Sequence, residues 1–185
     1  MTMGYKKYVT DYDKQYVIKP NGKPGVTAVY KGKYFRFAAD AAEIKRAKVL
    51  FGSLSVLAVV LTVIPLLYQS VGSHTLYVAL PHVISIFPLV HLILGIGGFC
   101  LWELPLIREQ RDKIETRSVA SSAVSACMLG ATAVAQAVNC VLSGFPLPDV
   151  LYVFFLLAAS AATGTVFFFR RLLKTEECDE RGEKK

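Results

Sequence analysis

The sequence predicts an all-α integral membrane protein, a four-transmembrane-helix bundle with a small N-terminal cytoplasmic β-hairpin or meander. Asp, Glu, Lys and Arg are absent from residues 49–102, 118–148 and 150–169, where a soluble fold of this size would need charged surface. A charge at the middle of a bilayer costs roughly 2.5–3.5 kcal/mol. The basic residues also gather on alternate connections between the apolar stretches, which is the pattern that sets orientation in a membrane.

The polar, basic segment 1–37 is expected to form the N-terminal head. Runs of β-branched and aromatic residues separated by Gly-containing turns predict short strands. A sheet of this size is not stable alone, so it must rest on the membrane, the bundle or a partner. A flexible tail with a weak hairpin is the alternative. The predicted strands are residues 16–19, 26–30 and 33–37.

Residues 38–174 are expected to form the membrane domain. About 20 apolar residues are needed to cross a hydrocarbon core of about 30 Å, and the chain offers four such stretches. Strong helix formers in residues 38–48 predict a helix that runs directly into the first span, with Pro65 near its other end. The predicted spans are residues 49–68, 82–102, 118–142 and 150–169.

The second apolar stretch, Thr75 to Ile107, is too long for one straight span. We therefore expect a short interfacial segment at residues 73–81, with Pro81 and Pro88 bending the entry into the membrane. At the other end of the chain, residues 175–185 form a charged tail, and we expect disorder beyond Lys174.

Basic residues predict that both termini are cytoplasmic. The loops 69–81 and 143–149 contain no Lys or Arg, so they are assigned to the outside. The short loops and simple topology favour a bacterial plasma membrane. The cations lie before the first span (Lys45, Arg46, Lys48), between the second and third (Arg108, Arg111, Lys113, Arg117) and after the fourth (Arg170, Arg171, Lys174).

The net charge of +7 is interpreted as attraction to a membrane surface and not to nucleic acid. Each basic residue near an anionic cytoplasmic leaflet contributes about 1 kcal/mol of attraction. The membrane-surface residues in this interpretation are Lys45, Arg46, Lys48, Arg170 and Arg171.

Three polar residues inside the predicted spans are the candidates for function: His91, Gln136 and Asn139. His91 is either hydrogen-bonded within the bundle or a proton-sensing residue that lines a polar path, because an ionisable group in a membrane is a functional hypothesis by default. Gln136 and Asn139 share one helix face. They either hold helices together or line such a path.

Small residues recur at every fourth position in the third span, and the fourth span has a similar pair. Such rows let helix backbones approach closely. They predict either packing within the chain or contact with a second copy or another membrane protein, and the pattern does not separate the two. The predicted packing residues are Ala123, Cys127, Ala131, Ala135, Ser160 and Gly164, with a second row at Ser122, Ala126 and Gly130.

The sequence predicts no catalytic centre, metal site or cofactor. His82, expected at the interface, and His91 are nine residues apart and point to opposite sides of a helix. The four cysteines contain no CxxC pair. We therefore expect a non-catalytic scaffold, accessory or regulatory subunit of a membrane complex. The alternatives are a small-solute or ion transporter or channel acting as an oligomer, and membrane-surface sensing by the head.

Overall fold

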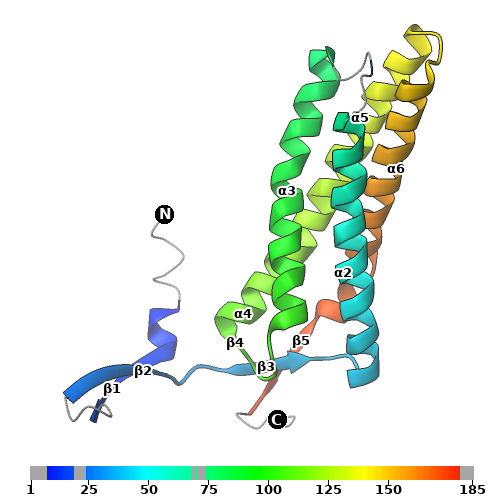
Figure 1. The fold of residues 1–185 in the computed structure, drawn as a ribbon. Coiled ribbons are helices and arrows are strands. Elements are labelled where there is room, and N and C mark those ends of the chain that lie inside the picture. Colours follow the sequence, from blue (N-terminus) through cyan, green and yellow to red (C-terminus); the bar gives the residue numbers. More distant parts are fainter. Residues whose placement is uncertain (1–7, 19–23, 68–69, 71–73, 180–185) are drawn as a thin grey trace.

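The computed structural model describes residues 8–18, 24–67, 70 and 74–179. Four long helices form one bundle, and the strands lie at one end of it, which we call the sheet end (Figure 1). The opposite end is the far end. Each helix packs against two others in the ring order α2, α3, α5, α6. The helices are α2 (Ala41–Val63), α3 (Leu76–Leu101), α5 (Val119–Leu142) and α6 (Leu147–Phe168).

Helix α2 confirms that the helix-forming segment before the first apolar stretch continues into it. The helix begins at Ala41 and runs without a break to Val63. A 3₁₀ turn, η2 (Ile64–Leu67), follows and contains Pro65. Proline has no N–H to donate within an α-helix, which explains why the regular helix ends here.

Helix α3 is one continuous helix from Leu76 to Leu101, with Pro81 and Pro88 inside it. The expected separate interfacial segment is therefore wrong for residues 76–81; residue 73 lies outside the described residues. The usual length of a membrane span, counted back from Trp102, and the presence of Pro81 do not show where this helix begins. Packed neighbouring helices and local side chains can compensate for the hydrogen bond that a proline removes.

The third long helix begins before its apolar stretch. Helix α4 (Arg108–Asp112) continues through one π-helical segment, η4 (Lys113–Ser118), into α5. Gly95 of α3 lies against this segment: a Cβ atom at Gly95 would lie 2.6 Å from Ser118 Oγ and 2.9 Å from Ser118 N. The two backbones approach too closely there for any side chain.

The strands form two separate sheets and not one meander. After the 3₁₀ turn η1 (Val9–Asp11), β1 (Tyr12–Ile18) and β2 (Pro24–Tyr30) form an antiparallel hairpin. Strand β3 (Tyr34–Phe37) instead pairs antiparallel with β4 (Leu106–Ile107) and β5 (Thr175–Cys178), in the order β4–β3–β5. The expected disorder beyond Lys174 is therefore wrong for residues 175–178.

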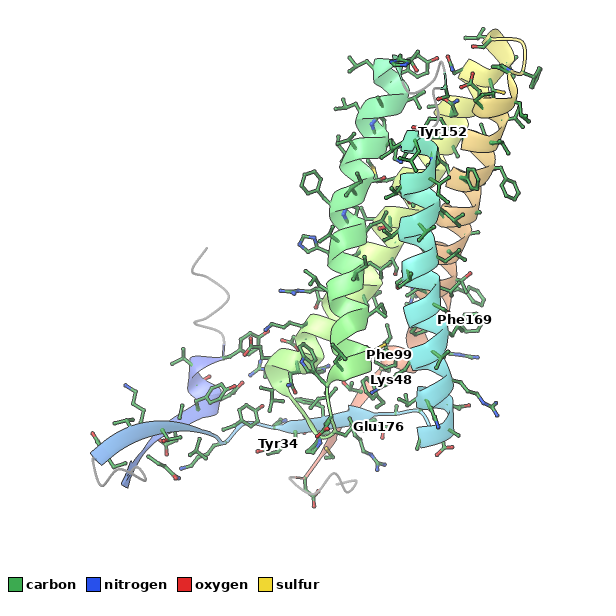
Figure 2. The ribbon with its side chains drawn as sticks, viewed as in Figure 1. Tyr34, Lys48, Phe99, Tyr152, Phe169 and Glu176 are labelled. Carbon is green, nitrogen blue, oxygen red and sulfur yellow. The ribbon has the colours of Figure 1, made fainter. Side chains whose placement is uncertain are left out.

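Aromatic packing explains why β3 joins the bundle. Phe35 and Phe37 are both buried. The Phe37 ring meets Phe99 of α3 edge-on with centroids 5.0 Å apart, and Phe99 lies 6.0 Å from Phe51 of α2. Lys48 lies next to Phe99 at this end of the bundle (Figure 2) and donates from Nζ to the Cys100 carbonyl at 3.1 Å. Burying these rings fixes β3 beneath the helices.

Candidate functional site

A buried polar cluster lies toward the far end of the bundle, where α2, α3 and α6 meet. His82 of α3 and Tyr152 of α6 are fully buried, and the Tyr152 side chain lies among the helices in the half of the bundle away from the sheets (Figure 2). The His82 Nδ1 atom is 2.5 Å from the Tyr152 hydroxyl, and its Nε2 atom is 3.0 Å from the Thr62 carbonyl oxygen of α2. One imidazole therefore links three helices.

The partners of His82 fix which nitrogen of a neutral imidazole carries the proton. A backbone carbonyl only accepts hydrogen bonds, so Nε2 must carry the proton and donate to Thr62. Nδ1 is then the acceptor, and the Tyr152 hydroxyl donates to it. The neutral imidazole uses both nitrogens, and Ser85 Oγ donates to the His82 carbonyl at 2.6 Å. The cluster is thus satisfied without a net charge.

A second buried pair joins the far ends of α5 and α6. The amide Nε2 of Gln136 donates to Asp149 Oδ1 at 2.9 Å, and both side chains are fully buried. Asp149 lies in the first turn of α6, where the helix dipole favours negative charge. The pair therefore links α5 to the first turn of α6 by a buried side-chain hydrogen bond.

Asn139 and His91 do not join Gln136. Asn139 is buried and accepts a hydrogen bond on Oδ1 from the Tyr77 hydroxyl of α3 at 3.1 Å. His91 is exposed on the surface of α3, where Nδ1 donates to the Phe87 carbonyl of its own helix at 3.0 Å. The three candidates are therefore not brought to one polar path, and the alternative of a bond inside the bundle is wrong for His91. His82 is buried among the helices, and its expected position at the membrane interface stays a prediction.

The rows of small residues have different positions. Ala126 and Gly130 of the second row face α6: Ser160 Oγ donates to the Ala126 carbonyl at 2.8 Å, and Gly164 approaches the Ala126 Cβ. The residues of the first row lie on a more solvent-accessible side of α5 than Ala126 and Gly130 do. Cys127 and Ala131 are exposed, whereas Ala123 and Ala135 are half-buried.

At the sheet end, Arg111 connects the loop between α3 and α5 to the C-terminal strand. Its guanidinium lies 4.7 Å from the Phe35 ring centroid. Nε donates to Thr175 Oγ1 at 3.1 Å, and NH2 pairs with Glu115 at 3.2 Å. Thr175 in turn donates to Glu115 at 2.9 Å. This network adds side-chain bonds to the backbone pairing of β3 with β5.

Three of the predicted membrane-surface cations lie along one stretch of α2. Lys45 and Lys48 line a cavity of about 680 Å³ that also includes Arg36 and Asp40. Arg46 is exposed on the same helix. After α6, Arg170 and Arg171 form the 3₁₀ turn η5 (Arg170–Leu173), and the Arg170 guanidinium lies 4.4 Å from the Phe167 ring centroid. The five cations therefore lie between Ala41 and Lys48 of α2 and directly after α6.

Titratable groups near the sheets have shifted pKa values. The Lys31 ammonium, which lies 2.6 Å from Asp13 Oδ2, lowers the pKa of that carboxyl. Burial raises the pKa of the Tyr30 phenol, whose oxygen accepts from the Arg108 backbone N–H at 3.0 Å. Burial also raises the pKa of the Cys178 thiol, so this thiol is protonated at neutral pH.

The fold gives the class of protein, which is a helical chain built around four long apolar helices. Four helices in the described residues are long and apolar enough to cross a membrane, and a small two-stranded sheet precedes them. Comparison with known proteins finds no matching family, no matching curated protein and no matching solved structure. Within the described residues, no group of three or more His, Cys, Asp or Glu side chains could hold a metal ion.

Sequence reasoning missed the importance of His82, Tyr152 and Asp149. Asp149 carried a signal, because it is the one acidic residue between two long apolar stretches. From the sequence alone, Asp149 is expected in a loop on the outside, whereas the structure buries it in the first turn of α6. The His82–Tyr152 contact had no such signal, because the two residues are 70 positions apart.

Proposed function

We propose that the chain is a multi-pass plasma-membrane protein with both termini in the cytoplasm, and that it is bacterial. The four apolar helices support insertion. Pairing of β3 with β5 supports termini on one side, because these strands lie close to the two ends of the chain. The clustering of Lys and Arg at the sheet end supports a cytoplasmic location for that end.

Within that topology, we propose a non-catalytic scaffold, accessory or regulatory subunit of a membrane complex. The supporting observation is how the buried polar side chains are used. Gln136 bonds to Asp149, Asn139 to Tyr77 and His82 to Tyr152. Each pair links two helices, as polar groups do in bundles whose helices gain little from hydrophobic burial in lipid. These side chains hold the bundle together and do not converge on a site for chemistry.

The outward row of small residues on α5 supports a protein partner in the membrane. Cys127 and Ala131 are exposed, so these two residues are not covered by the packing of α5 against α6. A helix of another membrane protein, or of a second copy, can approach closely along such a row. In this topology, the sheet end offers the same partner a second surface on the cytoplasmic side.

Two experiments test this proposal. Single cysteines at Arg111 and Ser143, in a chain whose four native cysteines are changed to Ala, are expected to react from opposite compartments in intact cells or oriented vesicles. Labelling of both from one side would contradict the topology. Purification in mild detergent, followed by mass spectrometry, is expected to recover a stoichiometric partner that Ala131→Trp displaces. Val49→Trp, which alters an exposed side chain of α2, away from α5, is the control.

A transporter or channel acting as an oligomer is the second candidate, and the exposed His91 favours it. A histidine on the outer surface of a lone bundle faces lipid, and packing of a second copy would cover it. A proteoliposome flux that His91→Ala abolishes, in a clean homo-oligomer without a partner, would support this candidate and count against the accessory role.

A further inference from the structure

The β1–β2 hairpin has one aromatic face and one polar face. Side chains alternate across a strand, and the register pairs Tyr12 with Tyr30, Lys14 with Ala28 and Tyr16 with Val26. The opposite face has the exposed polar residues Asp13, Gln15 and Thr27 together with the half-buried Val29. Tyr16 is 86% exposed and Val26 54%, so much of the aromatic face has no cover in the described structure.

The aromatic face is turned toward the bundle and not away from it. The hairpin projects sideways from the sheet end (Figure 1), and a cavity of about 730 Å³ lies between it and the start of the third long helix. Tyr12, Lys14 and Ala28 line the cavity from the hairpin. The opposite wall consists of Glu109, Asp112, Lys113, Thr116 and Arg117.

The depth of this cavity relative to the membrane follows from the helix that forms one of its walls. Residues 108–142 form one continuous helix, and charged residues end at Arg117, directly before the apolar stretch that begins at Ser118. In a membrane-inserted bundle, Arg117 therefore lies at the headgroup layer. The cavity and the aromatic face beside it lie at or just below that layer. Tyrosine is enriched at this depth because its ring is apolar and its hydroxyl is polar.

The charges in the cavity favour an anion. Its two acidic residues are both paired with cations. Glu109 Oε1 lies 2.5 Å from Lys113 Nζ. Asp112 Oδ1 lies 3.8 Å from Arg111 NH1, while Asp112 Oδ2 accepts from the Tyr8 hydroxyl at 3.0 Å. Lys14 and Arg117 form no ion pair in the part of the chain that the structure describes. Two cations, one on each wall, thus remain to bind a phosphate that enters from the leaflet.

We infer that the β1–β2 hairpin is a membrane-surface arm whose Tyr12–Tyr16–Val26 face lies on the leaflet at the sheet end, and that Lys14 and Arg117 bind the phosphate of an anionic phospholipid in the cavity beside it. This inference rests on the proposed membrane insertion. The exposed Tyr16 and Val26, and the two cations of the cavity that have no ion pair among the described residues, lie at the depth of the headgroup layer and argue for lipid as the occupant.

The orientation of the arm is tested with the full chain in nanodiscs of phosphatidylcholine with about 30% phosphatidylglycerol. In the chain with native cysteines changed to Ala, an environment-sensitive fluorophore is attached at Tyr16→Cys or Val26→Cys. The matched controls on the polar face are Gln15→Cys and Thr27→Cys. We expect lipid-borne nitroxide to quench the first pair at least about threefold more strongly, and aqueous iodide the second pair. Equal quenching of the fluorophore on both faces would contradict the proposal that the aromatic face of the hairpin lies on the leaflet.

The lipid site is tested by counting phosphatidylglycerol that remains bound to the purified full chain, using native mass spectrometry. Changing both cations, Lys14→Gln with Arg117→Gln, is expected to weaken retention about tenfold. The control Lys31→Gln with Lys33→Gln removes the same charge from residues paired with Asp13 and Glu177, and it should retain the lipid. Equal retention by both variants would overturn the site.

These outcomes are distinct from failure of the proposed function. If cysteines at Arg111 and Ser143 react from opposite sides while the two hairpin faces are quenched equally, insertion stands and only the arm is wrong. If the cysteines at positions 111 and 143 react from one side, the proposed topology is wrong, and the membrane-surface arm that depends on it is wrong as well.

Discussion

The Tyr152 hydroxyl of α6 and the His82 imidazole of α3 lie 2.5 Å apart, both fully buried. The other imidazole nitrogen is bonded to the Thr62 carbonyl of α2, so the His82 side chain links α3 to both α2 and α6. Three helices therefore meet through hydrogen bonds at one buried position.

Tyr152→Phe is expected to lower the free energy of unfolding by about 1–2 kcal/mol, because it leaves His82 Nδ1 buried without a donor. Titration of the detergent-solubilised protein with SDS, followed by circular dichroism, measures the change. Phe154→Leu, on an exposed part of α6, is the control and should change stability little. A Tyr152→Phe protein as stable as this control would contradict the role of the contact.

Asp149→Leu is expected to cost about 1–3 kcal/mol, because the amide of Gln136 would stay buried without its acceptor. The double variant Gln136→Leu with Asp149→Leu should be less destabilised than the sum of the two single variants, since neither polar group then remains. The same SDS titration, run as a double-mutant cycle, gives the coupling energy. A coupling energy of zero would show that the two side chains act independently.

Gly95→Ala and Gly97→Ala test the close approach of α3 to η4. A Cβ atom at Gly95 would lie 2.9 Å from the Ser118 backbone nitrogen, so the helices must separate, at a cost of about 1–3 kcal/mol. At Gly97 a Cβ atom meets nothing within 4 Å. We expect Gly97→Ala to be neutral or slightly stabilising, because Ala favours helix over Gly. Thermal unfolding in detergent distinguishes the two, and equal shifts would refute the contact.

Tyr34→Cys is expected to form a disulfide with the native Cys178, because the two positions are directly opposite each other in the β3–β5 pairing. Opposed antiparallel residues have Cα atoms about 4.5–5.5 Å apart, within disulfide reach. The other three cysteines are replaced by Ala, and Arg36→Cys, opposite Glu176, is the control. Peptide mapping after mild oxidation detects the bond.

The rate of this oxidation should rise between about pH 7 and pH 9. Burial raises the pKa of the Cys178 thiol, so the reactive thiolate is scarce at neutral pH and becomes more abundant as the pH increases. A disulfide formed equally fast by Arg36→Cys would contradict the register.

Much of the helical fold was predictable, because it depends on the length and composition of single segments. Apolar stretches free of charge predicted the four long helices, and Gly-containing turns predicted strands that overlap β1, β2 and β3. The same reasoning failed at Pro81, which it took for a boundary. Whether a proline interrupts a helix depends on the packing around it, and a local pattern does not contain that information.

The candidate site was predicted only in part. Gln136 and Asn139 act between helices, as one of the two interpretations had it, but their partners Asp149 and Tyr77 were not identified. His91 is a candidate from the sequence because an ionisable group in a membrane is a functional hypothesis by default, whereas the buried histidine of this helix is His82. Both lie on one apolar helix, and the arrangement of the neighbouring helices decides which one is covered.

Hydropathy and charge are properties of each segment, so the amino-acid sequence is enough to place the four long apolar helices and the positively charged connections. The packed structure is needed to show that β3 pairs with β4 and β5, that His82 meets Tyr152, and that the hairpin turns its tyrosines toward the bundle. These relationships join residues far apart in the chain, and they exist only once the helices have packed and fixed which surfaces face each other.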